Sequence, residues 1–398
     1  MLWNLNKIKQ VFICEWHNML NDRGAALIMI GAVFLYSIFY LAPFHNHIAR
    51  EIPIGVINQD NSALSRNVIR ALNANEMIKV PEFYDNLEQA KTAFYQNKIR
   101  AFIVIPKNFA HDIRRGKVTI VAAYLDSAYL IIYKQLTGGI NEVFSAIGAK
   151  TEIQSLTKQG FKKQQAHAIK NPIDFIQIPL FNPVGSYQNY IYPMVLILVL
   201  QQTMLIGIGI LFGTREERKQ KDNENAAILV LGRGLAYASL YLIYALIFFL
   251  LFPLIAAYPA SSNIFELLLF LIPFLLSTAF LGQTLSAVCK TRECCFFILI
   301  PSSVPFIFLS GFVWPLEAMP AAVNLFAKLI PSTSAMHGLV RLNQMNASFY
   351  MTLSDCLILW ILCLFYYSFE SVIYLSYGNS SYHVLQRFRL HQTSLPEL

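Results

Sequence analysis

About six apolar stretches, each long enough for a membrane-spanning helix, constrain this chain more than any other feature of its sequence. A helix needs about 20 apolar residues to cross a bilayer, where no water satisfies the backbone. With 56% hydrophobic and only 14% charged residues, the chain is typical of multi-span membrane proteins. The spans are predicted at residues 25–43, 191–212, 235–258, 265–289, 296–314 and 356–377.

Lysine and arginine gather at alternate ends of these spans. Because such residues are enriched in cytoplasmic loops, they predict a multi-pass protein of the bacterial inner membrane with both termini in the cytoplasm. The same bias explains the net charge of +8 better than nucleic-acid binding does, since no basic stripe alternates with stacking aromatic residues. The basic residues are Lys7, Lys9, Arg23, Arg215, Arg218, Lys219, Lys221, Arg233, Lys290, Arg292, Arg387 and Arg389.

Residues 44–189, between the first two predicted spans, are expected to form a periplasmic α/β domain. Strand patterns alternate there with helical patterns, which favours a compact mixed fold. The strands are predicted at 52–57, 77–84, 101–105 and 118–124, and the helices at 62–74, 87–98 and 129–167. No cysteine lies in this segment, so the domain is expected to use no disulfide.

Three shorter segments complete the organisation. Residues 1–24 have apolar side chains near helical spacing, which suits a helix in the membrane interface, although a short soluble cap is the alternative. Residues 312–345 are too apolar for an ordinary loop and are broken by prolines. We expect two short helical pieces there, in a re-entrant hairpin on the outer side. Residues 378–398 are expected to form a cytoplasmic tail.

Motifs for catalysis or metal binding are missing from the sequence. It contains no P-loop for ATP phosphates, no HExxH zinc motif and no GxSxG nucleophile motif. His45 and His47 lie near Glu51, but histidines two residues apart on a loop are expected to be polar residues at the headgroup level. We therefore expect no catalytic or metal site in this chain.

The run SGFVWPLEAMP, from Ser310 to Pro320, resembles the SGF…P…MP element of type-2 ABC-transporter permeases. The order of parts is similar over essentially the whole chain. In the loop after the second predicted span, residues 214–222 (TREERKQKD) begin like the charged run of these permeases but lack its Gly-Thr. Weaker similarities are Leu125-Asp126-Ser127, Asn182-Pro183, Ile330 to Ser334 and Gly338 to Arg341.

The resemblance implies a mainly α fold: a six-helix transmembrane permease with an N-terminal interfacial helix, a re-entrant hairpin before the last span and an inserted α/β periplasmic domain. It implies the permease subunit of an ATP-driven exporter for an amphiphilic or hydrophobic substrate, such as a drug or lipid. ATP and Mg would be bound by a separate ABC ATP-binding subunit. Other expected partners are a second permease copy or paralogue, membrane lipid and a periplasmic adaptor.

Three groups of residues are candidates for function. The resemblance makes the loop 213–233 the element that couples the permease to the ATPase. In the hairpin, glycine and proline allow bending, which suits an outer gate. The coupling candidates are Arg215, Glu216, Glu217 and Arg218, and the gate candidates are Ser310, Gly311, Phe312, Pro315, Met319 and Pro320. Glu370 lies within a span, where an acid is a functional candidate, although snorkelling or a hydrogen bond in the bundle is the alternative.

Two other functional classes stay open on the residues alone. A secondary transporter would need inverted repeats and charged or broken helices near the midplane, and Glu370 is the one feature that fits. A membrane-anchored periplasmic scaffold would not need five further spans. A membrane enzyme would need a catalytic constellation, and none is visible.

Overall fold

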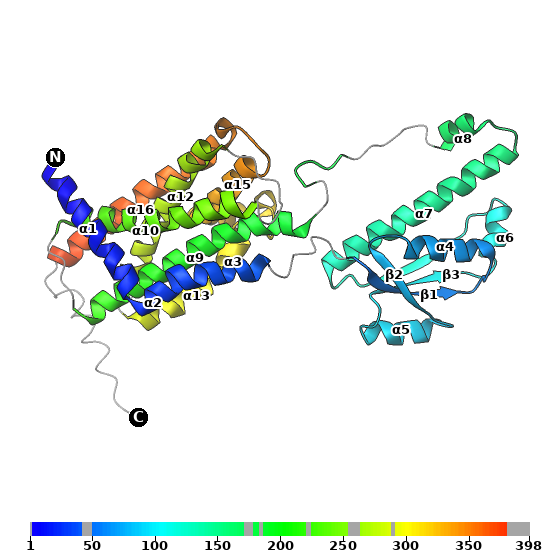
Figure 1. Ribbon diagram of the computed structural model, residues 1–398, viewed down its shortest axis with the longest axis horizontal. Coiled ribbons are helices and arrows are strands. Elements are labelled where there is room, and N and C mark those ends of the chain that lie inside the picture. Colours follow the sequence, from blue (N-terminus) through cyan, green and yellow to red (C-terminus); the bar gives the residue numbers. More distant parts are fainter. Residues whose placement is uncertain are drawn as a thin grey trace, which may run out of the picture. The chain divides into compact units, whose positions relative to one another are not determined.

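The computed structural model of the chain describes residues 2–41, 50–170, 178–182, 186–219, 224–253, 263–287 and 291–379. It consists of two compact units. The first, here called the helical unit, combines Met1–His47 with Pro179–Leu398. The second, here called the inserted domain, covers Ile48–Ile178 and contains the sheet (Figure 1). Each is described by itself.

Five helices of the helical unit are long and apolar enough to cross a membrane, counted over the described residues. Three of them contain proline within the helix, α9 and α12 once each and α13 twice. Membrane helices tolerate proline when neighbouring groups satisfy the freed carbonyls. The five are α9 (Tyr187–Glu217), α10 (Ala226–Leu246) continued by the π-helix η3 (Ile247–Leu251), α12 (Ile264–Ala287), α13 (Arg292–Leu309) and α16 (Leu353–Asn379).

The first predicted span takes a different form. The amino-terminal helix α1 (Leu2–Asn21) is followed by α2 (Arg23–Ala26), the π-helix η1 (Leu27–Ala32) and α3 (Val33–Leu41). The two halves of this segment are bent by 81° against each other. A sixth span therefore exists only if this bent pair is counted as one.

The prediction of a loop over residues 213–233 is wrong for most of these residues, which are helical. Helix α9 continues to Glu217, and α10 already begins at Ala226. The charged residues do not end α9, because Arg215 is buried against an acid from another helix. Charge alone predicts a loop here, while tertiary pairing allows the helix to continue.

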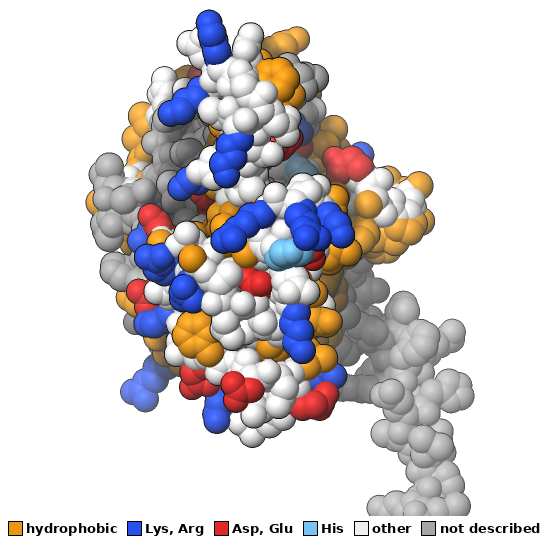
Figure 2. Space-filling view, turned by 90° about the vertical axis from the view of Figure 1, so that its right-hand side faces the viewer, with side chains coloured by type: hydrophobic (Ala, Val, Ile, Leu, Met, Phe, Trp, Pro, Cys, Tyr) orange, Lys and Arg blue, Asp and Glu red, His pale blue; other side chains and the backbone are white. Residues whose placement is uncertain are grey.

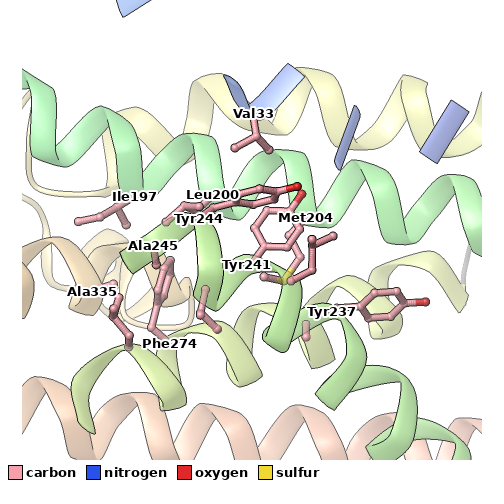
Figure 3. Close-up of a cluster of buried hydrophobic side chains, with 14 of the residues drawn as sticks. Val33, Ile197, Leu200, Met204, Tyr237, Tyr241, Tyr244, Ala245, Phe274 and Ala335 are labelled. Carbon is pink, nitrogen blue, oxygen red and sulfur yellow. The ribbon is translucent and has the colours of Figure 1, made fainter. Parts of the chain in front are cut away.

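The core of the helical unit is rich in tyrosine. Tyr241 and Tyr244 of α10 lie among aliphatic side chains from α9, with Phe274 of α12 nearby (Figure 3). The tyrosine rings are largely apolar and therefore pack well in this core. The Tyr241 hydroxyl donates a hydrogen bond of 3.1 Å to Thr203 Oγ1. Tyr237 belongs to the same cluster, but its hydroxyl points away from the other labelled side chains (Figure 3).

Before the last span, the chain forms a 3-10 turn and two short helices. They are η4 (Leu316–Ala318), α14 (Ala321–Ala327) and α15 (Pro331–Asn343). Pro320 caps α14, and Pro331 occupies the first turn of α15, where a missing N–H costs nothing. Helix α15 packs against α9, α12 and α16, and most of its side chains are buried. This segment is the hairpin of the sections below.

The inserted domain is a four-stranded mixed sheet with helices on both faces. Its strand order is β2-β1-β3-β4, with β1 parallel to β2 and β3, and β4 antiparallel to β3. Ile54 and Val56 point to one face and Ile57 to the other, as strand alternation requires. The strands are β1 (Ile52–Asn58), β2 (Ile78–Phe83), β3 (Ala101–Ile105) and β4 (Ala122–Leu125).

Helices cover the two faces of this sheet unequally. Side chains of α4, α6 and α7 pack on one face, while α5 packs on the other (Figure 1). Ser62 caps α4 by accepting a hydrogen bond of 3.1 Å from the Ser65 amide. The helices are α4 (Ala63–Asn73), α5 (Leu87–Tyr95), α6 (Phe109–Arg114), α7 (Leu130–Lys158) and α8 (Lys163–Lys170).

Three details of this domain differ from the sequence expectation. The fourth strand is shorter than 118–124 and begins at Ala122, and the short helix α6 was not predicted. The long helix expected over 129–167 is broken at Gly160 into α7 and α8. Figure 2 shows a face of the molecule on which Lys and Arg are mixed with Asp and Glu, which is typical of a solvated surface.

Candidate coupling site at the amino-terminal helix

Helix α1 carries a carboxylate on its apolar face. Val11 and Met19 lie one turn before and after Glu15 on this face, and the Glu15 side chain is only 2% exposed. A buried carboxylate is stable only when it is paired and hydrogen-bonded. Glu15 must therefore find its partners on the helices that α1 contacts.

The partners of Glu15 come from α9 and α10. Arg215 of α9 donates to both Glu15 carboxylate oxygens, and the Tyr237 hydroxyl of α10 donates to Oε1. A second guanidinium, that of Arg233, lies with Nε 3.8 Å from Glu15 Oε2. Burial opposes ionisation of the Glu15 carboxyl, but Arg215 and Arg233 together hold its pKa below the ordinary value of 4.5.

Arg233 extends this group to the last helix. Its Nη1 donates a hydrogen bond of 2.6 Å to the Tyr374 hydroxyl of α16. The Phe212 ring lies under both guanidinium groups, 5.4 Å from Arg215 and 5.8 Å from Arg233, which adds cation–π attraction. We call Glu15, Arg215, Arg233, Tyr237 and Tyr374 the ionic centre; it joins α1, α9, α10 and α16.

Further contacts fix α1 along α10. Lys7 donates a hydrogen bond of 2.6 Å to Glu224, just before α10 begins, and is ion-paired with it. Directly after Glu15 in the sequence, the Trp16 indole donates a hydrogen bond of 3.0 Å to Ser239 of α10. The amino-terminal helix is thus held at Lys7 and again at Glu15 and Trp16, and cannot shift along α10 without breaking polar bonds.

A second polar group joins α2 to α9 and α13. Asp22 caps α2 by accepting from the amides of Gly24 and Ala25 at 3.0 and 3.1 Å. Its other oxygen accepts from Thr214 at 2.8 Å and faces Arg292 at 3.4 Å. Burial raises the pKa of Asp22, but the Ala25 amide, Thr214 and Arg292 outweigh it, so the pKa lies below 3.8.

Helices α9 and α13 touch backbone to backbone beside this group. A Cβ on Gly213 would come 2.6 Å from the backbone nitrogen of Arg292, so only glycine allows this approach. The Glu217 carboxylate accepts from the Arg292 amide at 3.1 Å and pairs with its guanidinium at 3.3 Å. The end of α9 is therefore fastened to the start of α13.

The predicted coupling residues fall into two groups. Arg215 is 7% exposed and belongs to the ionic centre, so its side chain does not lie on the surface. Glu216, Glu217 and Arg218 are exposed at the end of α9. Only these three lie where another chain could contact them.

Three of the predicted gate residues, Ser310, Gly311 and Phe312, form the turn between α13 and the hairpin. Ser310 is buried, and its hydroxyl donates to the Ile307 carbonyl at 2.6 Å. Gly311 has φ +80°, and a Cβ there would come 2.7 Å from His337 Nε2, so glycine is required twice over. The carbonyl of Phe312 accepts a hydrogen bond of 3.1 Å from the Tyr190 hydroxyl of α9.

The remaining gate candidates lie outside this turn. Pro315 precedes η4 and is exposed, Met319 is half-buried, and Pro320 is exposed at the start of α14. The structure thus brings Ser310, Gly311 and Phe312 together against α9 and α15, whereas the two prolines define where the short helices begin.

Glu370 is fully buried in α16. Arg233 of α10 and Thr284 of α12 both act on its carboxyl, although neither carboxylate oxygen meets hydrogen-bond geometry with a described residue. Arg233 therefore interacts with two acids, Glu15 and Glu370. The predicted intramembrane acid is a neighbour of the ionic centre.

Sequence reasoning missed most of the ionic centre. Its clearest signal is Glu15, which is the only acid in α1 and falls on the apolar face with Val11 and Met19. The sequence predicts Arg233 in a loop because basic residues usually mark span ends, whereas the structure has it two turns inside α10. Tyr237 and Tyr374 carry no separate signal, since tyrosine is common in membrane helices.

Comparison with known proteins places this architecture in a family. The sequence profile described as "ABC-2 family transporter protein" matches residues 25–369. The chain is also 20% identical over 334 residues to the probable multidrug ABC transporter permease YbhS of Escherichia coli strain K12, covering 82% of this chain and 85% of the relative. The same values hold for the permease of that name from Escherichia coli O157:H7.

Proposed function

The chain belongs to the ABC-2 family of transporters, and on that premise we propose that it is the permease subunit of an ATP-driven exporter. Its cargo is an amphiphilic or hydrophobic molecule, such as a drug or lipid. The name of its Escherichia coli relatives, probable multidrug permeases, supports this class of cargo. ATP and Mg²⁺ are bound by a separate ABC ATP-binding subunit, and two permease chains, identical or paralogous, form the pathway.

The observation that carries the proposal is the connection between the exposed end of α9 and the ionic centre. Glu216, Glu217 and Arg218 offer a mixed-charge surface to an ATPase, and Arg215 next to them is bound to Glu15. A push on the end of α9 therefore acts on α1 and α10 at once. Helices tied in this way move as rigid bodies when the ATPase dimer closes.

In this proposal Arg215 is a positioning residue rather than a docking residue. It transmits the position of α9 to α1 through Glu15, and Arg233 transmits it on to α16 through Tyr374. At the other end of α9, Tyr190 holds Phe312 of the hairpin. A change at the charged end of α9 thus has a physical route to the hairpin, which we assign as the outer gate.

The orientation follows from the charge bias of the sequence. Both termini and the ATPase lie in the cytoplasm of a bacterial inner membrane, and the inserted domain lies in the periplasm. There the inserted domain is available to a periplasmic adaptor. This arrangement favours a transporter over a scaffold, because a scaffold has no use for a polar connection between the spans.

Charge reversal at the end of α9 tests the docking surface. The variant is Glu216→Lys with Arg218→Glu, which leaves Glu217 on Arg292, and the control is Arg66→Glu on the exposed surface of the inserted domain. We expect a P-loop ATPase to co-purify with the wild type and the control in detergent, and to be lost from the variant together with transport. If the ATPase and transport persist in the variant, the docking surface is wrong.

A further inference from the structure

A polar pocket of about 240 Å³ lies between the hairpin and α16. Ligand pockets for drug-sized molecules are about 300–1,000 Å³, so this one suits a smaller group. It is distinct from the ionic centre and shares no residue with it. Besides the hydroxyls of Thr333 and Ser334, its polar lining consists of charged, amide and imidazole side chains from the hairpin and the start of α16, namely Glu317, Asn324, Lys328, His337, Arg341 and Asp355.

The charges of the pocket cancel. Lys328 and Arg341 are balanced by Glu317 and Asp355, and Arg341 Nη1 lies 3.6 Å from Asp355 Oδ2. A pocket that holds positive and negative side chains close together disfavours a simple anion or a simple cation. An anion would leave the two carboxylates uncompensated, and a cation would leave the two basic side chains uncompensated. It matches a ligand that carries both signs within a few ångströms.

Three polar atoms of the pocket accept or donate no hydrogen bond within the described residues, although one of them, Asp355 Oδ2, is ion-paired with Arg341. Asn324 Oδ1, His337 Nε2 and Asp355 Oδ2 are buried and have no hydrogen-bond partner among the described residues. Two of these atoms are acceptors only, so they need N–H or O–H donors. The exposed side chains of Arg341 and Lys328 can swing aside to admit such a donor. A primary ammonium group supplies several donors and the matching charge.

Apolar side chains stand exposed on the same elements. Leu325 and Phe326 of α14 are 68% and 69% exposed, and Ile361 of α16 is 65% exposed one turn beyond the pocket residue Ile358. In a membrane-embedded chain such surface is covered by acyl chains. A ligand held here by its polar group would therefore have room for a hydrocarbon tail beside the pocket.

We propose that this pocket binds the headgroup of a zwitterionic phospholipid with a primary ammonium group. The ammonium group donates to Asp355 and Asn324, and the phosphate lies against Lys328 and Arg341. The acyl chains lie along α14 and α16. The pocket shares no residue with the ionic centre or with the docking surface on α9, so its loss leaves that surface unchanged.

The test is lipid binding to delipidated full-length protein in detergent, measured by native mass spectrometry and by thermal shift. The probes are dioctanoyl phosphatidylethanolamine, the phosphatidylcholine and phosphatidylglycerol of the same chain length, and free O-phosphoethanolamine. We expect phosphatidylethanolamine to bind about tenfold more tightly than phosphatidylcholine, because the trimethylated nitrogen of phosphatidylcholine has no N–H donor for Asp355 and Asn324. Tenfold corresponds to about 1.4 kcal/mol.

Two variants and a control decide the assignment. Asp355→Asn keeps the side-chain shape and should abolish the preference for phosphatidylethanolamine over phosphatidylcholine. Lys328→Gln, at an exposed position that folding does not require, should weaken both lipids by about tenfold, the loss of one charged contact. Glu266→Gln, at the start of α12, should change neither.

The same measurements can overturn the proposal. Equal binding of the three lipids, or binding that Lys328→Gln and Asp355→Asn leave unchanged, means that the lipids only coat the apolar surface. Equal binding of free O-phosphoethanolamine means that the pocket serves a soluble zwitterion and that the acyl chains are irrelevant.

Discussion

Glu15 and Arg215 lie 200 positions apart in the chain and meet as a buried ion pair between α1 and α9. Removing one member of a buried pair leaves an uncompensated charge, which costs about 3–5 kcal/mol. We therefore expect Glu15→Gln to lower the melting temperature in detergent strongly and to uncouple ATP hydrolysis from transport.

The matched control for this prediction is Glu293→Gln, which removes an exposed acid near the start of α13. It should have little effect on melting. In the double variant Glu15→Gln with Arg215→Gln, the two losses should not add, because contacting residues couple by about 0.5–3 kcal/mol. Additive losses would show that the two side chains act separately.

Acid should weaken the attachment of α2 to α9 through Asp22. Its pKa is lowered in the folded protein, so its contribution to stability is complete above the unfolded value near 3.8 and disappears as the pH falls through the folded value. Melting followed from about pH 7 down to about pH 3 should show a shallower acid loss in Asp22→Asn than in the wild type.

That shallower loss must come with lower stability of Asp22→Asn at neutral pH, since the asparagine cannot pair with Arg292 as a charge. Asp85→Asn in the inserted domain, an exposed acid, serves as control and should follow the wild-type curve. Identical acid curves for all three proteins would exclude Asp22 as a contributor.

The backbone contact between Gly213 and Arg292 should not tolerate a side chain. In Gly213→Ala the new Cβ would lie 2.6 Å from the Arg292 nitrogen, and overpacking of this kind costs about 1–3 kcal/mol. Gly31→Ala is the control, because its nearest neighbour would be Leu27 Cδ1 at an ordinary 3.5 Å. A melting temperature of Gly213→Ala as high as that of the control would contradict the close approach.

The proposed orientation predicts which side of the membrane reaches Cys14. This thiol is exposed on α1, whereas Cys356 and Cys363 are buried. In a variant that keeps Cys14 as its only cysteine, a membrane-impermeant maleimide should label inside-out vesicles and spare intact spheroplasts. Labelling in spheroplasts would place α1 on the outer side and reverse the proposed topology.

The spanning helices could be predicted because hydropathy is summed over a long segment and needs no partner. The helix ends could not. Helix α9 runs on to Glu217 because Arg215 is neutralised by Glu15, and a pairing over 200 positions leaves no local trace. The 81° bend after α1 likewise depends on Asp22, whose side chain caps the new helix and meets Thr214 and Arg292.

In the inserted domain, the sequence predicts an element well where turn and capping residues mark its ends. Strand β1 (Ile52–Asn58) and helix α4 (Ala63–Asn73) lie within one residue of the predicted strand at 52–57 and helix at 62–74. The sequence predicts the last strand from residue 118 because Val118 and Ile120 have strand propensity, but both side chains are exposed and the strand begins only at Ala122. Strand propensity is a property of the single residue, whereas strand pairing also requires a neighbouring strand with free backbone groups.

The ionic centre also has a consequence for biosynthesis. Glu15 leaves the ribosome long before Arg215 and Arg233, and Tyr374 follows later still. Until then the Glu15 carboxylate has no buried partner and must stay hydrated, which keeps α1 from settling into the bundle. The first helix to be made is thus among the last to dock, because it can dock only after the helices that carry its partners have been made.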